Sequence, residues 1–167
     1  MWYNIFSKKD DWALTQKKYA NIPGQRGIDL RNKYYAPFFL SFGNNVKIME
    51  GCKFDFPERI VLSDNVSINI NSNIIGSGGV IIGRHVMIGH NFFLHSANHN
   101  TKPNAKAYFE RGFDYKSVKI GDNVLISANV GVLPGAIIGN GSFVAYGATI
   151  PAGEYPPNSK IFGVGKA

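Results

Sequence analysis

The amino-acid sequence predicts an all-β fold, a parallel β-helix in which short strands wind around a triangular coil. The first observation is a column of aliphatic residues spaced six apart, which near the C-terminus comprises Ile120, Ile126, Val132, Ile138, Val144 and Ile150. The second is that two earlier sets keep the same spacing, namely Leu62, Ile68 and Ile74, and then Ile82, Ile88 and Leu94. The third is that a small residue often follows the aliphatic one, as at Gly83, Gly89, Gly121, Ser127, Gly139 and Ala145.

A period of six matches neither the 3.6-residue period of a helix nor the two-residue alternation of an ordinary strand. It fits a strand followed by a turn, with three such hexads completing one triangular coil. The aliphatic residue then points inward, and the small residues allow the tight bend. Hexapeptide repeats are typical of parallel β-helices. A β-sandwich would instead show turns every eight to twelve residues with alternation between them.

The ends of the chain depart from the repeat, as an open stack with capped ends requires. Residues 1–45 are predicted to form an N-terminal cap, with a short helix over residues 10–20 that stops near Pro23 and an irregular aromatic stretch to about Phe42. The β-helix is expected over residues 46–158, and residues 159–167 form a short closing segment.

Two breaks in the six-residue frame mark insertions. Eight residues separate Ile74 from Ile82, so two extra residues bulge out around Gly76–Gly79. The step from Leu94 to Ile120 is far longer, and residues 100–119 are predicted to leave the coil as a protruding loop. A long loop on a rigid scaffold is usually functional.

Composition limits the class of protein. Hydrophobic residues make up 44% of the 167 residues and charged ones 17%, which indicates a folded chain. Cys52 is the single cysteine, which excludes an internal disulfide framework and a multi-thiolate zinc site. The first residues lack the apolar core of a signal peptide, and no uncharged apolar run approaches the ~20 residues of a membrane span. We therefore expect a cytoplasmic protein.

The net charge of +7 has three possible meanings. Basic residues gather near the N-terminus and around the predicted loop. They could bind nucleic acid, attract a phosphate-bearing small molecule, or form a solvated basic face. No zinc-finger spacing or RNA-binding sheet motif supports nucleic acid, so no nucleic-acid partner is expected.

His99 stands where the coil stops and the predicted loop begins. Imidazole, with an unperturbed pKa of about 6.5, suits a general base near neutral pH. A surface or capping histidine is the structural alternative, and the loop boundary alone leaves the two open.

The run from Ile88 to His99, IGHNFFLHSANH, resembles the pre-catalytic coil of the hexapeptide-repeat O-acetyltransferases. This family includes galactoside and maltose acetyltransferases and enzymes that acetylate cell-surface sugars. The stretch from Val118 to Val130, VKIGDNVLISANV, resembles the family's coenzyme-binding coils. The resemblance implies a left-handed β-helix, acetyl-CoA as co-substrate, a sugar acceptor, and a homotrimer with each active site between two subunits. No metal is implied.

The resemblance also assigns roles to residues. His99 matches the general base, which deprotonates the acceptor hydroxyl for direct attack on the thioester, without an acyl-enzyme. Asn69, Asp55, Ser77 and Asn98 are the candidate acceptor contacts. The candidate coenzyme contacts are the backbone N–H of Ala128, which matches an oxyanion donor, with Tyr146, Gly147, Lys160 and Lys166.

Three departures from the family pattern concern the coenzyme. Leu125 stands where many relatives carry Trp, Tyr146 replaces a usually small residue, and the C-terminal segment stops short of the usual basic tail. For the trimer, we expect the outward-facing side chains of Phe92, Phe93 and Phe143 to be covered at an interface.

Alternatives remain at this point. His85, His90 and His95, five residues apart, could hold zinc with His99 across a subunit interface, as in the γ-class carbonic anhydrases, although a spacing of five moves off one face. Ice-binding or purely structural β-helices need a flat threonine array that this chain lacks. Transfer to an amino sugar nitrogen is also possible, and the sequence does not identify the acceptor.

Overall fold

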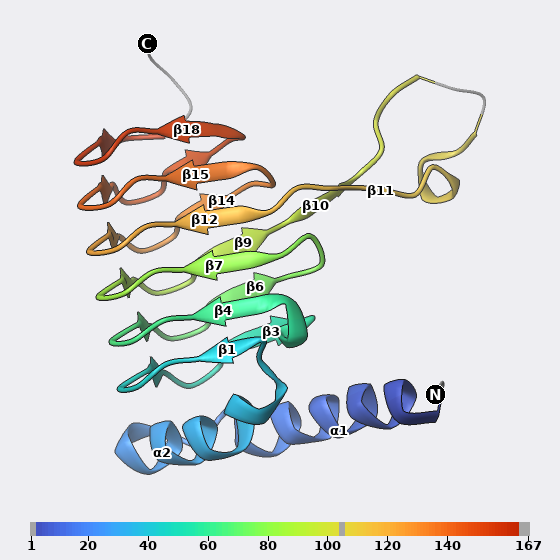
Figure 1. The fold of residues 1–167 in the computed structure, drawn as a ribbon, viewed down its shortest axis with the longest axis vertical. Coiled ribbons are helices and arrows are strands. Elements are labelled where there is room, and N and C mark those ends of the chain that lie inside the picture. The colour runs from blue at the N-terminus through green and yellow to red at the C-terminus, as the bar shows by residue number, and fades with distance from the viewer. Residues whose placement is uncertain (1–2, 104–105, 164–167) are drawn as a thin grey trace.

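The computed structural model describes residues 3–103 and 106–163, with side chains from residue 10 onward. The described chain is a left-handed parallel β-helix of about six coils, with two helices packed beneath its first coil (Figure 1). The predicted fold class is therefore confirmed. None of the helices in these residues combines the length and hydropathy needed to cross a bilayer.

Three parallel sheets form the three sides of the prism. Sheet 1 contains β1 (Ser41–Phe42), β4 (Ile60–Leu62), β7 (Val80–Ile82), β12 (Val118–Ile120), β15 (Ala136–Ile138) and β18 (Gly153–Tyr155). Sheet 2 contains β2 (Lys47–Ile48), β5 (Ser67–Ile68), β8 (Met87–Ile88), β13 (Leu125–Ile126), β16 (Phe143–Val144) and β19 (Lys160–Ile161). Sheet 3 contains β3 (Lys53–Asp55), β6 (Asn73–Ile75), β9 (Phe93–His95), β14 (Gly131–Val132) and β17 (Thr149–Ile150).

In each coil the chain passes through sheet 1, sheet 2 and sheet 3 in turn. The turns between the sheets form the three corners of the prism. We call them corner 1–2, corner 2–3 and corner 3–1, after the sheets that each connects. Register partners are stacked one coil apart, as with Ile82, Ile120 and Ile138 in sheet 1. The coil therefore begins at β1 and continues through β19, beyond both boundaries expected from the sequence.

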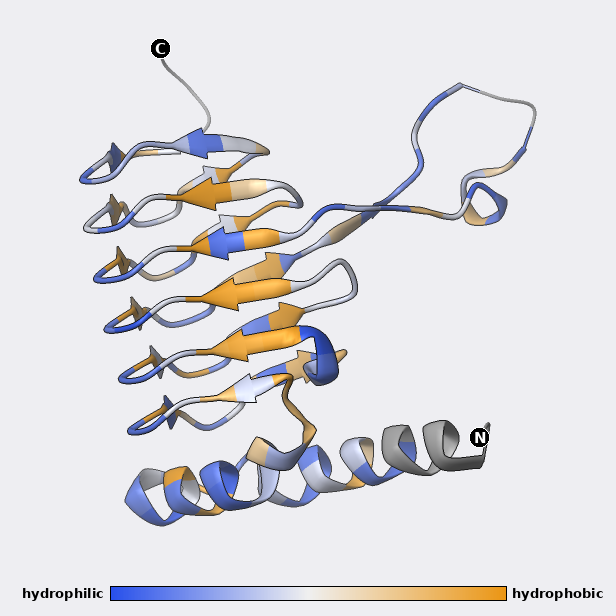
Figure 2. Cartoon of the chain, in the orientation of Figure 1, coloured by the Kyte–Doolittle hydropathy of each residue, from blue (hydrophilic) through white to orange (hydrophobic). Residues whose placement is uncertain are grey.

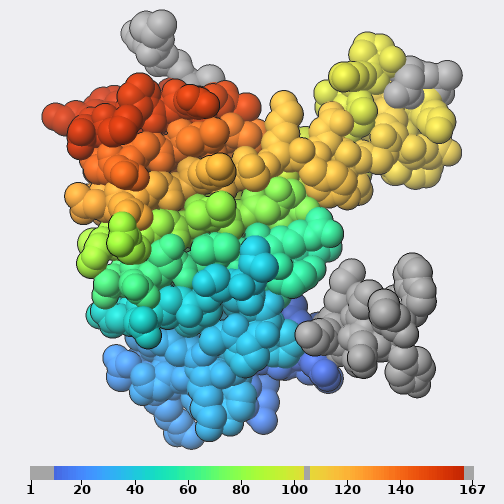
Figure 3. All heavy atoms as spheres, viewed as in Figure 1, coloured from blue at the N-terminus to red at the C-terminus, as the bar shows by residue number. Residues whose placement is uncertain are grey.

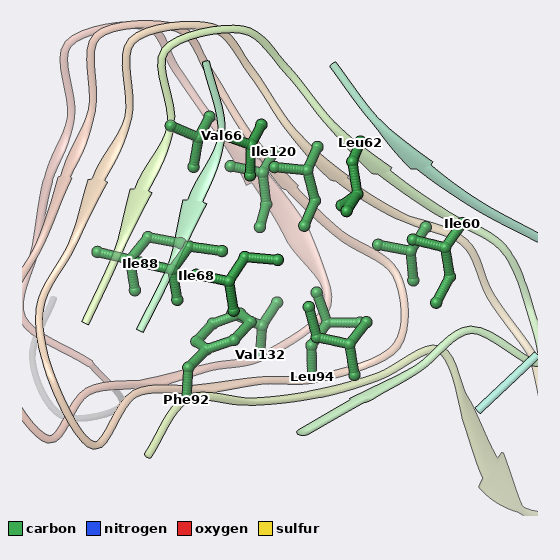
Figure 4. Close-up of a cluster of buried hydrophobic side chains, with 14 of the residues drawn as sticks. Ile60, Leu62, Val66, Ile68, Ile88, Phe92, Leu94, Ile120 and Val132 are labelled. Carbon is green, nitrogen blue, oxygen red and sulfur yellow. The ribbon is translucent and has the colours of Figure 1, made fainter. Parts of the chain in front are cut away.

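The predicted aliphatic columns fill the interior of the prism. All twelve residues of the three predicted sets are at most 2% exposed, and Figure 4 shows several of them meeting inside the coil. Hydropathy follows the same division, because many of the strands are hydrophobic while the turns at corner 1–2 are mostly polar (Figure 2). Burial of these columns is the main force that holds the stack together.

A second inward column lies two residues before the first. It includes Val86, Val124 and Val130, all buried, and Phe92 occupies the same phase. Phe92 is only 1% exposed, so the prediction that it faces outward was wrong. A hexad has two inward positions, and the sequence prediction used only one. Phe93 and Phe143 are partly exposed on the outer faces of sheets 3 and 2.

The corners require left-handed backbone. Nine described non-glycine residues have positive φ, and seven of them are asparagines. Asparagine tolerates this conformation better than other residues with a Cβ. The remaining two are Phe56 and His85.

The cap differs from the prediction. Helix α1 (Tyr3–Tyr19) begins before residue 10, and helix α2 (Gly24–Tyr35) occupies the stretch expected to be irregular, followed by the 3₁₀ turn η1 (Ala36–Phe38). The buried face of α2 includes Ile28, Arg31 and Tyr35. The Arg31 guanidinium is fully buried and donates to the carbonyls of Tyr19, Ile22 and Ile48, which ties both helices to the first coils.

The insertions lie at corner 3–1. The 3₁₀ turn η2 (Pro57–Arg59) occupies this corner in the first coil, and the bulge around Gly76–Gly79 occupies it in the second. The protruding loop is a hairpin of β10 (Ala97–His99) and β11 (Phe113–Tyr115), with a 3₁₀ turn η3 (Tyr108–Glu110) near its far end. The chain thus leaves the coil at 97 rather than 100, and it returns by Val118 rather than after 119. Val118 belongs to the second inward column, which the prediction did not use.

Candidate active site

The hairpin projects sideways from the prism, well clear of its body (Figures 1 and 3). Its strands pair antiparallel, with Ala97 opposite Tyr115, Asn98 opposite Asp114 and His99 opposite Phe113. Ser96 anchors the root of the hairpin. Its hydroxyl donates to the Ile75 carbonyl (3.0 Å) and accepts from the Gly78 N–H (2.8 Å), while its carbonyl accepts from the Lys116 N–H (2.9 Å).

His99 is exposed at the root of this hairpin, where β10 leaves the prism. Its imidazole lies 4.3 Å from the Phe113 ring, centroid to centroid, so the returning strand supports it from the side. His95, at the end of β9, is close enough to interact with it electrostatically. Burial lowers the pKa of His95, and the nearby His99 lowers it further. The neighbouring imidazole is thus biased toward its neutral form.

A hollow of about 430 Å³ opens between the hairpin and the coils that follow it. Its lining includes Asn98, His99, Asp114, Lys116, Leu133 and Pro134. We call it the upper hollow. It brings a carboxylate, a cation and apolar surface together on the C-terminal side of the hairpin, and His99 lies on its border.

The predicted acceptor contacts do not all share one corner. Asp55, Ser77 and Asn98 lie at corner 3–1 with His99, but in three successive coils. Asp55 and Asn98 are exposed, whereas Ser77 is only 7% exposed, and its carbonyl accepts a hydrogen bond from the Arg59 guanidinium.

Asn69 lies at corner 2–3 instead. Its side-chain oxygen accepts from the Ile70 N–H, and its carbonyl accepts from the hydroxyl of Ser72 and the thiol of Cys52. Burial raises the pKa of the Cys52 thiol to about 11. The thiol is therefore protonated at neutral pH, and Cys52 is not an activated nucleophile.

Corner 2–3 also holds most of the predicted coenzyme contacts. The Gly147 N–H donates to the Ala128 carbonyl (3.1 Å), so these two residues occupy consecutive coils. The Tyr146 hydroxyl accepts from the Asn129 side chain (2.6 Å), and Asn129 accepts in turn from Asn91 (3.0 Å). Lys160 is exposed in β19 on sheet 2, and Lys166 lies outside the described residues.

Two residues at this corner were missed by the sequence prediction. Asn129 fixes the Tyr146 hydroxyl, and only its left-handed turn position could have indicated this. Gly89 lets the coils approach, since a Cβ there would lie 2.6 Å from the Ala128 nitrogen. The sequence marks this glycine as a repeat residue only. Its contact with Ala128 could not be predicted, because the hairpin makes the step between these two coils 38 residues long, from Ile88 to Ile126.

A single chain therefore divides the predicted site between two corners, with sheet 3 between them. His99, Asn98, Ser77 and Asp55 lie on one side of that sheet. Ala128, Tyr146, Gly147 and Asn69 lie on the other.

The histidines do not form a metal cluster within the described residues, which contain no group of three or more His, Cys, Asp or Glu able to hold an ion. His85 lies at corner 1–2, His90 at corner 2–3, and His95 and His99 beside corner 3–1. Within one chain the four histidines are therefore spread over the three corners.

Comparison with known proteins agrees with this architecture. The family "Bacterial transferase hexapeptide (six repeats)" matches residues 117–152. WbbJ of Escherichia coli K12, named as a lipopolysaccharide biosynthesis O-acetyl transferase, is 34% identical over 135 residues, which cover 75% of this chain and 68% of WbbJ. The chain belongs to the hexapeptide-repeat acetyltransferases. Galactoside O-acetyltransferase of Lactococcus lactis is 29% identical over 76% of this acetyltransferase and 54% of its own length.

Solved structures show the same fold. The hexapeptide-repeat acetyltransferase VCA0836 of Vibrio cholerae, complexed with acetyl coenzyme A, superposes with a TM-score of 0.75 at 20% identity, covering 92% of this acetyltransferase and 81% of that chain. A maltose O-acetyltransferase from Clostridium difficile also gives 0.75, at 21% identity over 91% and 79% of the two chains.

Proposed function

We propose that this acetyltransferase moves an acetyl group from acetyl-CoA to a sugar hydroxyl, with His99 as general base. The observation that carries the proposal is the position of His99. Its ring is supported by Phe113 at the root of a hairpin that is itself anchored to the coil, and the residue borders a hollow on the C-terminal side. A base held on rigid strands beside an open hollow can meet a bound hydroxyl.

The reaction balances with one proton carrier. The neutral imidazole of His99 takes the hydroxyl proton as the acceptor oxygen attacks the thioester carbonyl. The tetrahedral oxyanion is stabilised by a backbone donor, for which Ala128 is the candidate. The carbon–sulfur bond then breaks, the acetyl ester remains on the sugar, and the thiolate takes the proton back from His99. General-base assistance of this kind contributes about 10²–10⁴-fold.

Corner 2–3 suits an extended acyl carrier. Gly147 has no atom within 4 Å of where a Cβ would be, so the corner is open there. Tyr146 is exposed beside it, and Leu125 and Phe143 leave apolar surface exposed on the adjoining sheet 2. Ala128, Tyr146 and Gly147 would contact the pantetheine arm, and Lys160 with Lys166 would meet the phosphates. When bound, acetyl-CoA supplies the activated acetyl group.

The divided site supports a homotrimer. Because the His99 corner and the Ala128 corner lie on opposite sides of sheet 3, a complete site needs the Ala128 corner of a neighbouring copy. Closed cyclic symmetry would complete three equivalent sites at once. The exposed Phe93 and Phe143 supply apolar surface for such contacts. Light scattering that gives a monomer at micromolar concentration would contradict this arrangement.

The names of the relatives support a cell-surface saccharide as acceptor. They include proteins named for lipopolysaccharide and colanic acid biosynthesis and for galactoside acetylation. We therefore propose action on such a sugar in the cytoplasm, where acetyl-CoA is available. A structural neighbour named AntD is an N-acyltransferase, similar at a TM-score of 0.56 and 18% identity. Mass analysis of the product separates an ester from an amide.

The decisive experiment replaces His99 with Ala and follows thiol release from acetyl-CoA with a panel of saccharide acceptors. We expect turnover to fall by about 10²–10⁴-fold, with acetyl-CoA affinity unchanged by calorimetry. His85→Asn is the matched control. His85 lies at the remote corner 1–2, and it has positive φ like Asn65 and Asn123 at the same turn position of neighbouring coils, so asparagine suits its backbone. An unchanged rate in His99→Ala would exclude His99 as the base.

A further inference from the structure

A second hollow lies on the N-terminal side of the hairpin, between the hairpin root and the first coils. It measures about 460 Å³, and its lining includes Glu58, Arg59, Ser77, Gly78, Gly79 and Tyr115. We call it the lower recess. Its size falls in the ~300–1,000 Å³ range of small-molecule sites. Apart from Ser77, the function proposed above uses none of these residues.

The lower recess is built by the two insertions below the hairpin together with Tyr115 of the hairpin itself. Turn η2 contributes Glu58 and Arg59, and the eight-residue step from Ile74 to Ile82 contributes the glycines. A Cβ on Gly78 would overlap the Ser96 carbonyl oxygen and lie 3.0 Å from the Lys116 nitrogen. Gly79 has φ +92°, a conformation that favours glycine. Gly78 and Gly79 thus form a floor without side chains, against which the hairpin root packs directly.

The polar groups of the recess suit neutral hydroxyls. The Arg59 guanidinium is held by the Ser77 carbonyl and lies 5.8 Å from the Phe56 ring. A guanidinium has five N–H donors, and the bond to Ser77 uses one. Glu58 adds a carboxylate acceptor, and no ion pair within the described residues joins it to Arg59. The guanidinium can donate to one hydroxyl of a vicinal pair and the carboxylate can accept from the other. Because their charges are opposite, the recess does not favour an anionic ligand.

Aromatic rings lead from this recess to His99. Tyr115 lines the recess, its ring centroid lies 6.1 Å from that of Phe113, and Phe113 lies 4.3 Å from His99. His99 and Phe113 are register partners, and Tyr115 is two residues further along the same strand, so all three share one face of the hairpin. The apolar face of a pyranose stacks well on such rings.

We propose that the lower recess binds the sugar unit next to the one that is acetylated, so that the acceptor is a saccharide of at least two linked units. The inference rests on the proposed function. One unit stacks at Tyr115 with its hydroxyls on Arg59 and Glu58. The glycosidic bond continues along the hairpin, and the next unit presents its hydroxyl to His99.

The test measures saccharide binding by saturation-transfer NMR on the full-length His99→Ala variant, which separates binding from turnover. The probes are methyl β-galactoside against methyl β-galactobioside, and methyl α-glucoside against methyl α-maltoside. In at least one series we expect the two-unit probe to bind about tenfold tighter. Tyr115→Ala or Arg59→Gln should remove most of that advantage while leaving the single-unit affinity unchanged.

Two control variants match these changes. Tyr108→Ala alters an exposed tyrosine at the far end of the hairpin, and Arg26→Gln alters an exposed arginine on α2. The inference is wrong if two-unit probes bind no tighter than one-unit probes, if no probe binds at millimolar concentration, or if Tyr115→Ala behaves like Tyr108→Ala. If the His99→Ala protein shows no preference for two-unit probes while the wild type still transfers acetyl groups, only the recess is rejected. An intact advantage without any transfer from acetyl-CoA rejects the proposed function.

Discussion

Two corners of the prism differ in the number of residues that they place between successive core positions. At corner 1–2 every step between stacked core residues is six residues, as from Phe42 to Ile48 and from Ile120 to Ile126. At corner 3–1 the steps are eight, eight, twenty-six, six and five residues, namely Phe54 to Leu62, Ile74 to Ile82, Leu94 to Ile120, Val132 to Ile138 and Ile150 to Tyr155.

The regular corner is stabilised by polar groups stacked along it. Asp64 accepts from the Asn44 backbone, Asp122 pairs with Arg84 at 2.8 Å, and Asn140 accepts from the Asp122 backbone. The irregular corner instead carries η2, the glycine bulge and the hairpin with His99. The repeat thus supplies the scaffold, and the candidate base lies where the repeat is interrupted.

The largest effect is expected where the irregular corner is most crowded. Gly78→Ala places a Cβ against the Ser96 carbonyl and the Lys116 nitrogen at the hairpin root. Overpacking of this kind costs about 1–3 kcal/mol of unfolding free energy. The root must shift, so acetyl transfer should fall by more than tenfold. Urea unfolding and the thiol-release assay measure both.

The stability control for this change is Gly131→Ala. A Cβ at Gly131 meets nothing within 4 Å, so its unfolding midpoint should stay near that of the wild type. Equal midpoints for both variants would show that the hairpin root is not packed as described.

A smaller effect is expected from the ring beside His99. Phe113→Ala removes the contact at 4.3 Å, and aromatic pairs contribute about 0.5–1.5 kcal/mol. We expect kcat to fall by about tenfold or less while the KM for acetyl-CoA stays constant. Phe109→Ala, at the exposed far end of the hairpin, should keep kcat. A loss of equal size in both variants would mean that the hairpin acts as a whole and that Phe113 does not position His99.

The smallest effect is expected at the regular corner. Hydrogen bonds from Arg84 lower the pKa of the Asp122 carboxyl. Since the folded-state pKa is depressed, its stabilisation is present above the unfolded pKa of about 3.9 and is lost as pH falls through the folded value. Asp122→Asn should therefore lower the melting temperature slightly at neutral pH and not at strongly acid pH. Asp29→Asn on α2 is the surface control, and a larger change there would remove any special role of this pair.

The coil could be predicted from the sequence because buried columns impose a visible period. Helix α2 was missed because Arg31 occupies a core position, and the carbonyls of Tyr19, Ile22 and Ile48 that bind its guanidinium lie outside the helix, 9 to 17 residues away. Phe92 was placed outward because only one of the two inward columns was used.

The candidate site was predictable in part. The frame break located His99 at the root of an insertion, but the pairing with Phe113 fourteen residues later left no periodic signal. The recess beneath the hairpin was also hidden, since it forms from three separate insertions that come together only when the coils stack. Its η2 part, the step from Phe54 to Leu62, lies where the repeat had not yet been recognised.

All variation in chain length falls along one seam of the molecule, and the buried columns on either side of it stay in register. A different hairpin between Ser96 and Ser117 would therefore leave the interior columns untouched. This makes the seam a natural exchange point, at which the parts proposed to recognise the acceptor can be swapped between members of the family while the scaffold is kept.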